Sequence, residues 1–227
     1  MEESFNDIPL PGLEAPSDSG PSFAHEQAMG QAHGFPVAGI DEAGRGPWAG
    51  PVVAAAVILD PDVSIPGIDD SKRLTPKKRA ALFDLIQEKA LAFGVAFVRA
   101  REIDELNIRR ATHLAMKRAY QVLCTKMKPA SVLIDGNDAP TLSVPHRALV
   151  RGDRLSLSIA AASILAKVSR DNLMIAMDKS FPGYGFADHK GYGTPKHAEA
   201  LNRLGVSKLH RHSFEPVRAV IEKKISG

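Results

Sequence analysis

The 227-residue sequence contains a single cysteine, Cys124, and a single tryptophan. One cysteine excludes an intramolecular disulfide and a zinc site built on several cysteines, so the composition is typical of a reducing compartment, and we expect the cytoplasm. No run of about eighteen apolar residues is present to span a membrane. The N-terminus also lacks the basic start and apolar stretch of a secretory signal. We therefore expect neither membrane insertion nor export.

Lysine and arginine are absent from residues 1–35, which contain six acidic residues. This stretch is rich in proline, serine and glycine and shows no helical or strand period, which predicts a disordered acidic extension over residues 1–35. Residues 36–227 have the length of one domain and carry 29 basic and 20 acidic side chains, a net charge of +9. Such an excess indicates a polyanion such as nucleic acid, although an enzyme of small acids can show it too.

Short apolar runs alternate with helical patterns along residues 36–227. The runs predict strands at residues 35–40, 52–59, 94–100, 131–135 and 146–151. The helical patterns predict helices at residues 75–93, 102–126, 157–177, 194–204 and 215–224. This order favours an α/β fold in which helices pack against one sheet.

Acidic residues stand at the ends of predicted buried strands. Asp41 and Glu42 end the first strand, Asp135 ends the fourth, and Asp153 follows the fifth. If the first and fourth strands are neighbours, Asp41 and Asp135 repel each other unless a cation compensates them. Oxygen-only ligands favour Mg²⁺ or Mn²⁺ over Zn²⁺, and four carboxylates can hold two such ions for phosphodiester hydrolysis. The alternative is that each acid is a solvated turn residue.

A glycine-rich loop over residues 44–50 directly follows the acid pair. Its glycines let backbone amides approach a ligand closely, and Arg45 can contact a phosphate. The loop lacks the Gly-Lys-Ser/Thr ending of a nucleotide-binding phosphate loop, which argues against a nucleoside triphosphatase. A tight hairpin turn is the alternative interpretation. Two histidines further on, His210 and His212, have no acid between them and favour structural or phosphate contacts over a metal site.

Residues 38–47, Ala-Gly-Ile-Asp-Glu-Ala-Gly-Arg-Gly-Pro, closely resemble the signature of ribonuclease HII. Further segments resemble the same family in the same order: residues 70–74, 133–137, 152–153 leading into 158–167, 189–194 and 210–214. The resemblance covers roughly residues 36–217. It implies a ribonuclease H-like fold, with a mixed five-stranded sheet flanked by helices and a C-terminal helical part. The catalytic domain would then span residues 36–227.

The resemblance also implies an activity. It is that of an endonuclease hydrolysing the phosphodiester 5′ of ribonucleotides, both in RNA/DNA hybrids and where they are embedded in duplex DNA. Two-metal-ion catalysis with Mn²⁺ or Mg²⁺ would leave 3′-hydroxyl and 5′-phosphate ends. Nucleic acid is thus the expected partner, and we expect a monomer.

Residue roles follow from the same resemblance. The catalytic carboxylates correspond to Asp41, Glu42, Asp135 and Asp153, with Asp41, Glu42 and Asp135 as metal ligands. Backbone contacts of Gly44, Arg45 and Gly46 would read the ribose 2′-hydroxyl, the group that separates RNA from DNA. Tyr192 resembles the residue that packs on the sugar of the next deoxynucleotide. Arg151 stands where the family commonly has lysine, which keeps the charge.

Three more residues are candidates for substrate binding. Lys72 lies between two acids and a proline-started helix, from which it can approach the scissile phosphate. Ser163 and Lys167 are four residues apart, so they share a helix face that Asp153 can place beside the metals. Solvated lysines and a small packing serine are the alternative.

Two other functions stay open at this point. A nuclease of the same fold that cuts four-way DNA junctions would lack the Gly-Arg-Gly loop and Tyr192, which are present here. A non-catalytic nucleic-acid-binding module would make the acids incidental, and then Asp135→Asn would leave metal affinity unchanged.

Overall fold

A computed structural model describes residues 20–225. Its core is one five-stranded sheet in the order β3-β2-β1-β4-β5. The strands are β1 (Val37–Ala43), β2 (Val52–Ile58), β3 (Ala92–Val98), β4 (Ser131–Asp135) and β5 (His146–Leu149). β2 is antiparallel to β1 and β3, whereas β1, β4 and β5 are mutually parallel. The predicted mixed sheet is confirmed, and the carboxyl ends of β1, β3, β4 and β5 therefore share one edge.

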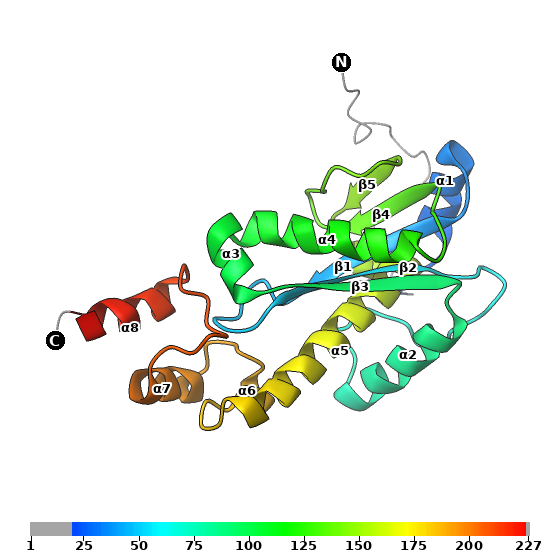
Figure 1. The fold of residues 1–227 in the computed structure, drawn as a ribbon. Coiled ribbons are helices and arrows are strands. Elements are labelled where there is room, and N and C mark those ends of the chain that lie inside the picture. Colours follow the sequence, from blue (N-terminus) through cyan, green and yellow to red (C-terminus); the bar gives the residue numbers. More distant parts are fainter. Residues whose placement is uncertain (1–19, 226–227) are drawn as a thin grey trace, which may run out of the picture.

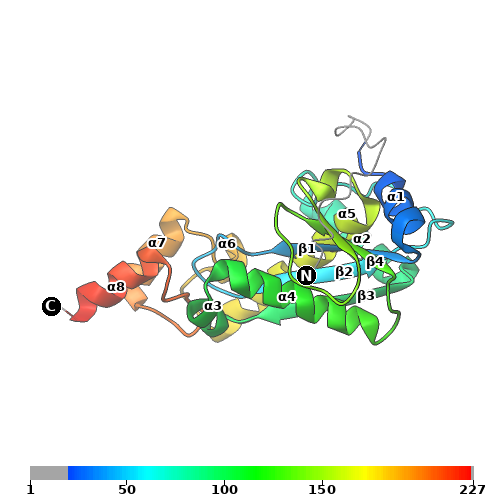
Figure 2. The same cartoon turned by 90° about the horizontal axis from the view of Figure 1, so that it is seen from above.

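Helices cover both faces of this sheet (Figures 1 and 2). On one face, α4 (Ile108–Cys124) packs its buried side against β1, β2 and β3. On the other face, α5 (Leu157–Ser180) crosses β1 and β2, and α2 (Pro76–Lys89) packs against α5. Gly39 explains how close α5 lies, because a Cβ at this position would stand 2.2 Å from the backbone carbon of Ser158. Each face of the sheet thus has its own apolar core.

The long helix predicted for residues 102–126 is two helices. α3 (Ala100–Leu106) ends at Asn107, whose φ of 68° lies in the left-handed region, and α4 begins directly after it. The Asn107 side chain accepts a hydrogen bond from the amide of Arg110 at 3.1 Å and so caps the new helix. The prediction missed this break because the apolar period continues through Asn107 and does not indicate a cap.

The prediction of disorder throughout residues 1–35 is wrong for residues 20–35, while residues 1–19 lie outside the described part. α1 (Ala24–His33) packs on β1 and β4 and buries Met29. Its buried Glu26 carboxylate accepts hydrogen bonds from the Ser156 hydroxyl at 2.7 Å and the Ser158 amide at 2.8 Å. These contacts cap the N-terminus of α5. The folded body therefore begins before residue 36, through a long-range contact that local sequence does not reveal.

The C-terminal helical part extends beyond the carboxyl edge of the sheet (Figure 2). It contains α6 (Phe186–His189), α7 (Pro195–Leu204) and α8 (Glu215–Ile225). The glycine-rich loop between β1 and β2 is tied to it, since Ala49 forms an isolated bridge with His210 and the Trp48 amide donates to the Gly191 carbonyl at 2.8 Å. Within residues 20–225, no helix is long and apolar enough to cross a membrane.

Candidate active site

The four candidate carboxylates meet at the carboxyl edge of the sheet. β1 and β4 are parallel neighbours with Ile40 opposite Ile134, so Asp41 and Asp135 lie side by side, as predicted. Asp153 belongs to a short 3₁₀ helix (Gly152–Arg154) that precedes α5. Its amide donates to Asp135 Oδ1 at 3.4 Å. The ends of two strands and the start of one helix therefore converge here.

The pleat of β1 divides the acid pair. β1 continues through Ala43 instead of ending before the acids, with Asp41 opposite Ala55 and Glu42 opposite Ala54. Ala55 belongs to the core on the α5 face and Ala54 to the core on the α4 face. Because successive strand residues point to opposite faces, Asp41 is directed toward α5 and Glu42 toward α4. The acids thus approach the edge from two sides.

Burial and mutual repulsion dominate the electrostatics of these acids. Asp41 is buried, and desolvation together with the charges of Glu42, Asp135 and Asp153 holds its pKa well above the usual range. Burial, Asp135 and Asp70 raise the pKa of Asp153 to about 6. Burial also raises the pKa of Glu42, although Arg45, whose Nη1 lies 3.5 Å from Glu42 Oε1, opposes this. The site accumulates negative charge that the protein only partly neutralises.

This donor set suits a hard divalent cation. Within residues 20–225, no three acidic, histidine or cysteine side chains form a ready-made ion cage. All four candidates nevertheless offer only oxygen ligands, the type that Mg²⁺ and Mn²⁺ prefer. A cation between Asp41, Glu42 and Asp135 would relieve the repulsion that raises their pKa values. The chemistry of the residues therefore fits the expected metal.

The glycine-rich loop turns its amides outward beside these acids. Gly44 has a φ of 96°, and a Cβ there would meet the buried Arg170 side chain at 2.1 Å. A Cβ on Gly46, by contrast, would enter open space, so packing within the described chain does not require a glycine there. Among residues 20–225, the amides of Arg45 and Gly46 have no acceptor. They are available to a ligand.

Tyr192 and Lys167 lie together next to this loop. Tyr192 is 43% exposed, and its ring centroid is 5.8 Å from Lys167 Nζ and 5.7 Å from Arg170 Cζ. Lys167 also pairs with Asp171 at 2.8 Å. The ring of Tyr192 is thus partly exposed, with two cations near it, and its exposed surface is open to stacking on a sugar.

Ser163 has a different neighbour from the one expected. It is buried, and its hydroxyl donates to the Ser71 hydroxyl at 2.7 Å. This hydrogen bond joins Ser163 to the segment that carries Lys72. Burial alone would lower the pKa of Lys72, but the carboxylates of Asp41, Asp153, Asp70 and Asp135 together raise it. Lys72 thus lies in the field of the acids.

Several neighbours of the site were not among the predicted site residues. Asp70 shares a side-chain hydrogen bond with Asp153 and accepts the Lys72 amide at 2.9 Å. A hollow of about 300 Å³ runs from Glu42, Arg45 and Asp135 toward α4. There Asp138 binds Arg109 Nε at 2.7 Å and His113 Nε2 at 3.1 Å. Asp70 lies in a segment that carries the family resemblance, whereas the pairing of Arg109 with Asp138 spans 29 residues and has no local signal.

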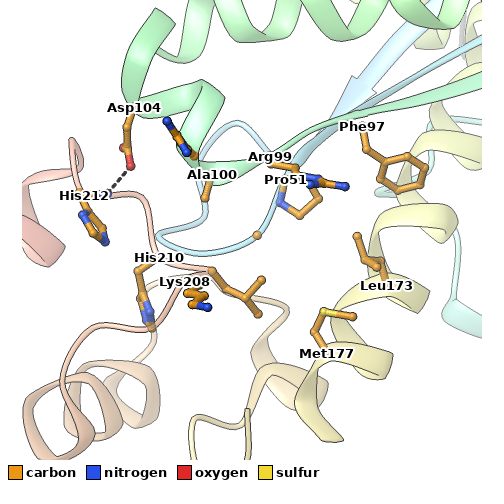
Figure 3. A pocket seen from close by; sticks show the side chains of 13 residues that line it. Pro51, Phe97, Arg99, Ala100, Asp104, Leu173, Met177, Lys208, His210 and His212 are labelled. Carbon is orange, nitrogen blue, oxygen red and sulfur yellow. Dashed lines mark hydrogen bonds between the residues drawn. The ribbon is translucent and has the colours of Figure 1, made fainter. Parts of the chain in front are cut away.

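A second, larger hollow of about 870 Å³ opens on the far end of the same loop, at Gly50 and Pro51 (Figure 3). Phe97, Leu173 and Met177 give it apolar walls. Asp104 also lines this hollow, and its carboxylate accepts hydrogen bonds from the amides of His212 and Ser213 at 2.9 and 2.8 Å. None of the candidate site residues lines it, so this hollow is separate from the acidic edge.

The fold is similar to that of solved ribonuclease H2 and ribonuclease HIII structures. Ribonuclease H2 from Pyrococcus horikoshii OT3 has a TM-score of 0.72 at 27% identity, and the match covers 84% of this chain and 99% of that one. Bst ribonuclease HIII in complex with Mn²⁺ has a TM-score of 0.62 at 17% identity over 84% of this chain and 70% of that one. The second likeness concerns the fold alone.

This fold is that of a metal-dependent nuclease of the ribonuclease H class, with the acidic edge as its candidate active site. The sequence profile described as Ribonuclease HII matches residues 38–217. Ribonuclease HII from Desulfitobacterium hafniense (strain Y51) is 55% identical over 186 residues, which cover 82% of this chain and 71% of that protein. The chain belongs to the ribonuclease HII family, endonucleases that act on RNA/DNA hybrids.

Proposed function

We propose that this enzyme hydrolyses the phosphodiester on the 5′ side of a ribonucleotide, in RNA/DNA hybrids and at ribonucleotides embedded in duplex DNA. The products would be a 3′-hydroxyl and a 5′-phosphate. The observation that carries the proposal is the juxtaposition of the acidic edge with a loop whose Arg45 and Gly46 amides are free. A hydroxyl that distinguishes ribose from deoxyribose can be bound there, next to the carboxylates.

Each group of residues has a task in this reaction. Gly44, Arg45 and Gly46 bind the ribose 2′-hydroxyl through the backbone, and the exposed ring of Tyr192 packs on the sugar that follows. Lys72 offers its positive charge to the scissile phosphate, with Asp70 and the Ser71–Ser163 hydrogen bond fixing its segment. Lys167 supports Tyr192. The residues that recognise the ribonucleotide would thus lie next to the residues that hydrolyse the phosphodiester.

Asp41, Glu42 and Asp135 would hold divalent cations, with Asp153 completing the acidic edge. Two bound ions would supply a water of lowered pKa and neutralise charge on the departing oxygen. Both Mg²⁺ and Mn²⁺ fit carboxylate ligands. We therefore propose that the enzyme uses Mn²⁺ or Mg²⁺.

Cellular context follows from simple features. Cys124 is free in the structure, in keeping with a reducing compartment, and we place the enzyme in the cytoplasm. We propose that it acts as a monomer, because loop, carboxylates and Tyr192 all come from one chain.

A labelled duplex with one embedded ribonucleotide tests the proposed function, beside an all-DNA duplex, each with Mg²⁺, Mn²⁺ or chelator. We expect metal-dependent cutting only 5′ to the ribonucleotide. Asp41→Asn should abolish it, whereas Asp62→Asn, at an exposed position away from the site, should not. Equal cutting of both duplexes, or no cutting of this duplex or of a long hybrid, would refute the proposal.

A further inference from the structure

The glycine-rich loop is held by two buried guanidinium groups. Arg211 donates from Nε to the Gly50 carbonyl at 3.0 Å, from Nη1 to the Arg45 carbonyl at 2.8 Å and from Nη2 to the Gly44 carbonyl at 2.5 Å. Arg170 donates to the carbonyls of Pro51 and Ala49 at 3.0 and 3.1 Å. Both side chains have 0% exposure. Four carbonyls of the loop, together with that of the following Pro51, therefore point into the protein.

The two arginines reach the loop from distant parts of the chain. Arg170 belongs to α5, which begins next to Asp153 at the acidic edge, and Arg211 follows α7 in the C-terminal part. The Arg211 amide also donates to the Trp48 carbonyl at 2.8 Å. The loop is thus fastened both to the helix that starts at the carboxylates and to the segment after α7.

This arrangement is costly for a simple turn. Within residues 20–225, neither arginine forms an ion pair with a carboxylate, so carbonyl dipoles are their principal partners. Burial and the neighbouring Arg170 lower the pKa of Arg211 to about 9. Two like charges buried side by side oppose folding, because charge is desolvated without full compensation. These hydrogen bonds fix the conformation of the loop.

That conformation decides where the loop amides point. Carbonyls that are bonded inward leave the amides of Arg45 and Gly46 on the outer side, where they have no acceptor in the described chain. Within residues 20–225, Arg211 is the side-chain donor to both the Gly44 and the Arg45 carbonyl. Loss of its forked geometry would let these peptide planes rotate.

We propose that Arg211, assisted by Arg170, is the positioning residue that sets the selectivity of the loop for ribose over deoxyribose. The inference rests on the proposed reading of the 2′-hydroxyl by Gly44, Arg45 and Gly46. Arg211 does not touch the substrate; it acts by holding the carbonyls of the residues that do. Lysine cannot replace it, because a single ammonium nitrogen cannot reach three separate carbonyls along a rigid fork.

The test is Arg211→Lys, measured first by binding without cleavage. In chelator, the affinities for a duplex with one ribonucleotide and for the same all-DNA duplex are compared. We expect the wild-type protein to prefer the ribonucleotide, and Arg211→Lys to lose that preference while its affinity for all-DNA is retained. In Mg²⁺, kcat should fall on the order of 10- to 100-fold, because misplacement by about 1 Å costs this much.

Two controls make the outcome decisive. Leu123→Ala removes a fully buried side chain of α4 away from the loop and serves as a variant of lowered thermal stability with selectivity intact. If Arg211→Lys does not fold, Arg170→Lys is measured in the same way and should reduce the preference in the same direction. A folded Arg211→Lys protein that keeps the wild-type ribose preference would overturn the inference. A wild-type protein without any binding preference would refute the premise that the loop reads the 2′-hydroxyl, whereas the cleavage assay tests the proposed function separately.

Discussion

At the scale of the residue, the buried acids of the acidic edge lower the stability of the metal-free protein but are the groups proposed to bind the metal. Asp41 is buried among Glu42, Asp135 and Asp153, and its raised pKa shows that its charged form is unfavourable there without a cation. Residues with this combination of burial and charge neighbours occur at functional sites more often than elsewhere. The metal-free protein should therefore be strained at this edge.

Asp41→Asn tests that strain directly. In chelator near pH 7.5, we expect the variant to be more stable than the wild type by about 1 to 2 kcal/mol, because a buried charge is removed. Activity should be lost. Added Mg²⁺ should raise the melting temperature of the wild type by mass action but have little effect on the variant. Thermal scans across Mg²⁺ concentrations measure both effects, with Asp62→Asn as control. A variant less stable than wild type in chelator would contradict this account.

Sequence reasoning located the four acids because they stand at strand ends, and the pairing of β1 with β4 then brings Asp41 and Asp135 together. It could not find Asp70, Arg109 or Asp138 as neighbours of the site, since their contacts depend on how a loop and α4 fold back. Ser163 has a contact that helix spacing could not reveal. Its hydroxyl bonds Ser71, which lies 92 residues earlier in the chain.

At the scale of the element, a histidine pair joins α7 to the segment after it. His210 Nε2 lies 3.1 Å from His197 Nε2, and both side chains are buried. His197 Nδ1 lies 2.9 Å from the Tyr192 carbonyl, and His210 Nδ1 accepts the Ser207 amide at 3.0 Å. These contacts assign a donor proton to His197 Nδ1 and another to His210 Nε2. Both rings are then neutral, and the pair supports the backbone of Tyr192.

Protonation should disrupt this pair. Burial, then the charge of His197, lowers the pKa of His210 to about 4, so the folded state binds its proton less readily than the unfolded chain, where the pKa is about 6.5. Its contribution is therefore complete above pH 6.5 and is lost as the pH falls toward 4. We expect a loss of up to roughly 3 kcal/mol in the free energy of unfolding.

Denaturant unfolding of wild type and His210→Gln from pH 7.5 to 4.5 measures that loss. The acid Asp153, with its pKa raised to about 6, changes stability in the opposite direction over this range, so only the difference between the two proteins is informative. We expect the wild type to lose more stability than the variant on acidification. Parallel curves would show that the histidine pair does not carry the effect.

Prediction of the elements succeeded where apolar period and turn residues agreed, as at β2 and β4. It failed at Asn107, where one capping side chain divides a continuous apolar pattern into α3 and α4. It failed again at α1, whose stability depends on Glu26 reaching the start of α5, 130 residues away. The Asn107 cap is a local signal that the continuous apolar pattern concealed, whereas the Glu26 contact is absent from local sequence.

At the scale of the whole molecule, the net charge of +9 on residues 36–227 favours binding of a polyanionic nucleic acid. The hollow beside the carboxylates carries Arg45, Arg109 and His113, which extend the site along α4. Phosphates neutralised by such groups release counterions, so binding should weaken steeply as salt increases.

A salt titration of duplex binding in chelator tests this picture. The logarithm of the binding constant should fall linearly with the logarithm of salt concentration, with a slope of about −0.9 for each phosphate contacted. Arg109→Ala should reduce the steepness by about one contact if Arg109 exchanges Asp138 for a phosphate. Lys77→Ala, on the exposed surface of α2 outside this hollow, is the matched loss of one charge and should leave the slope nearly unchanged. If both variants changed the slope equally, the overall charge would govern binding, and the path along α4 would have no special role.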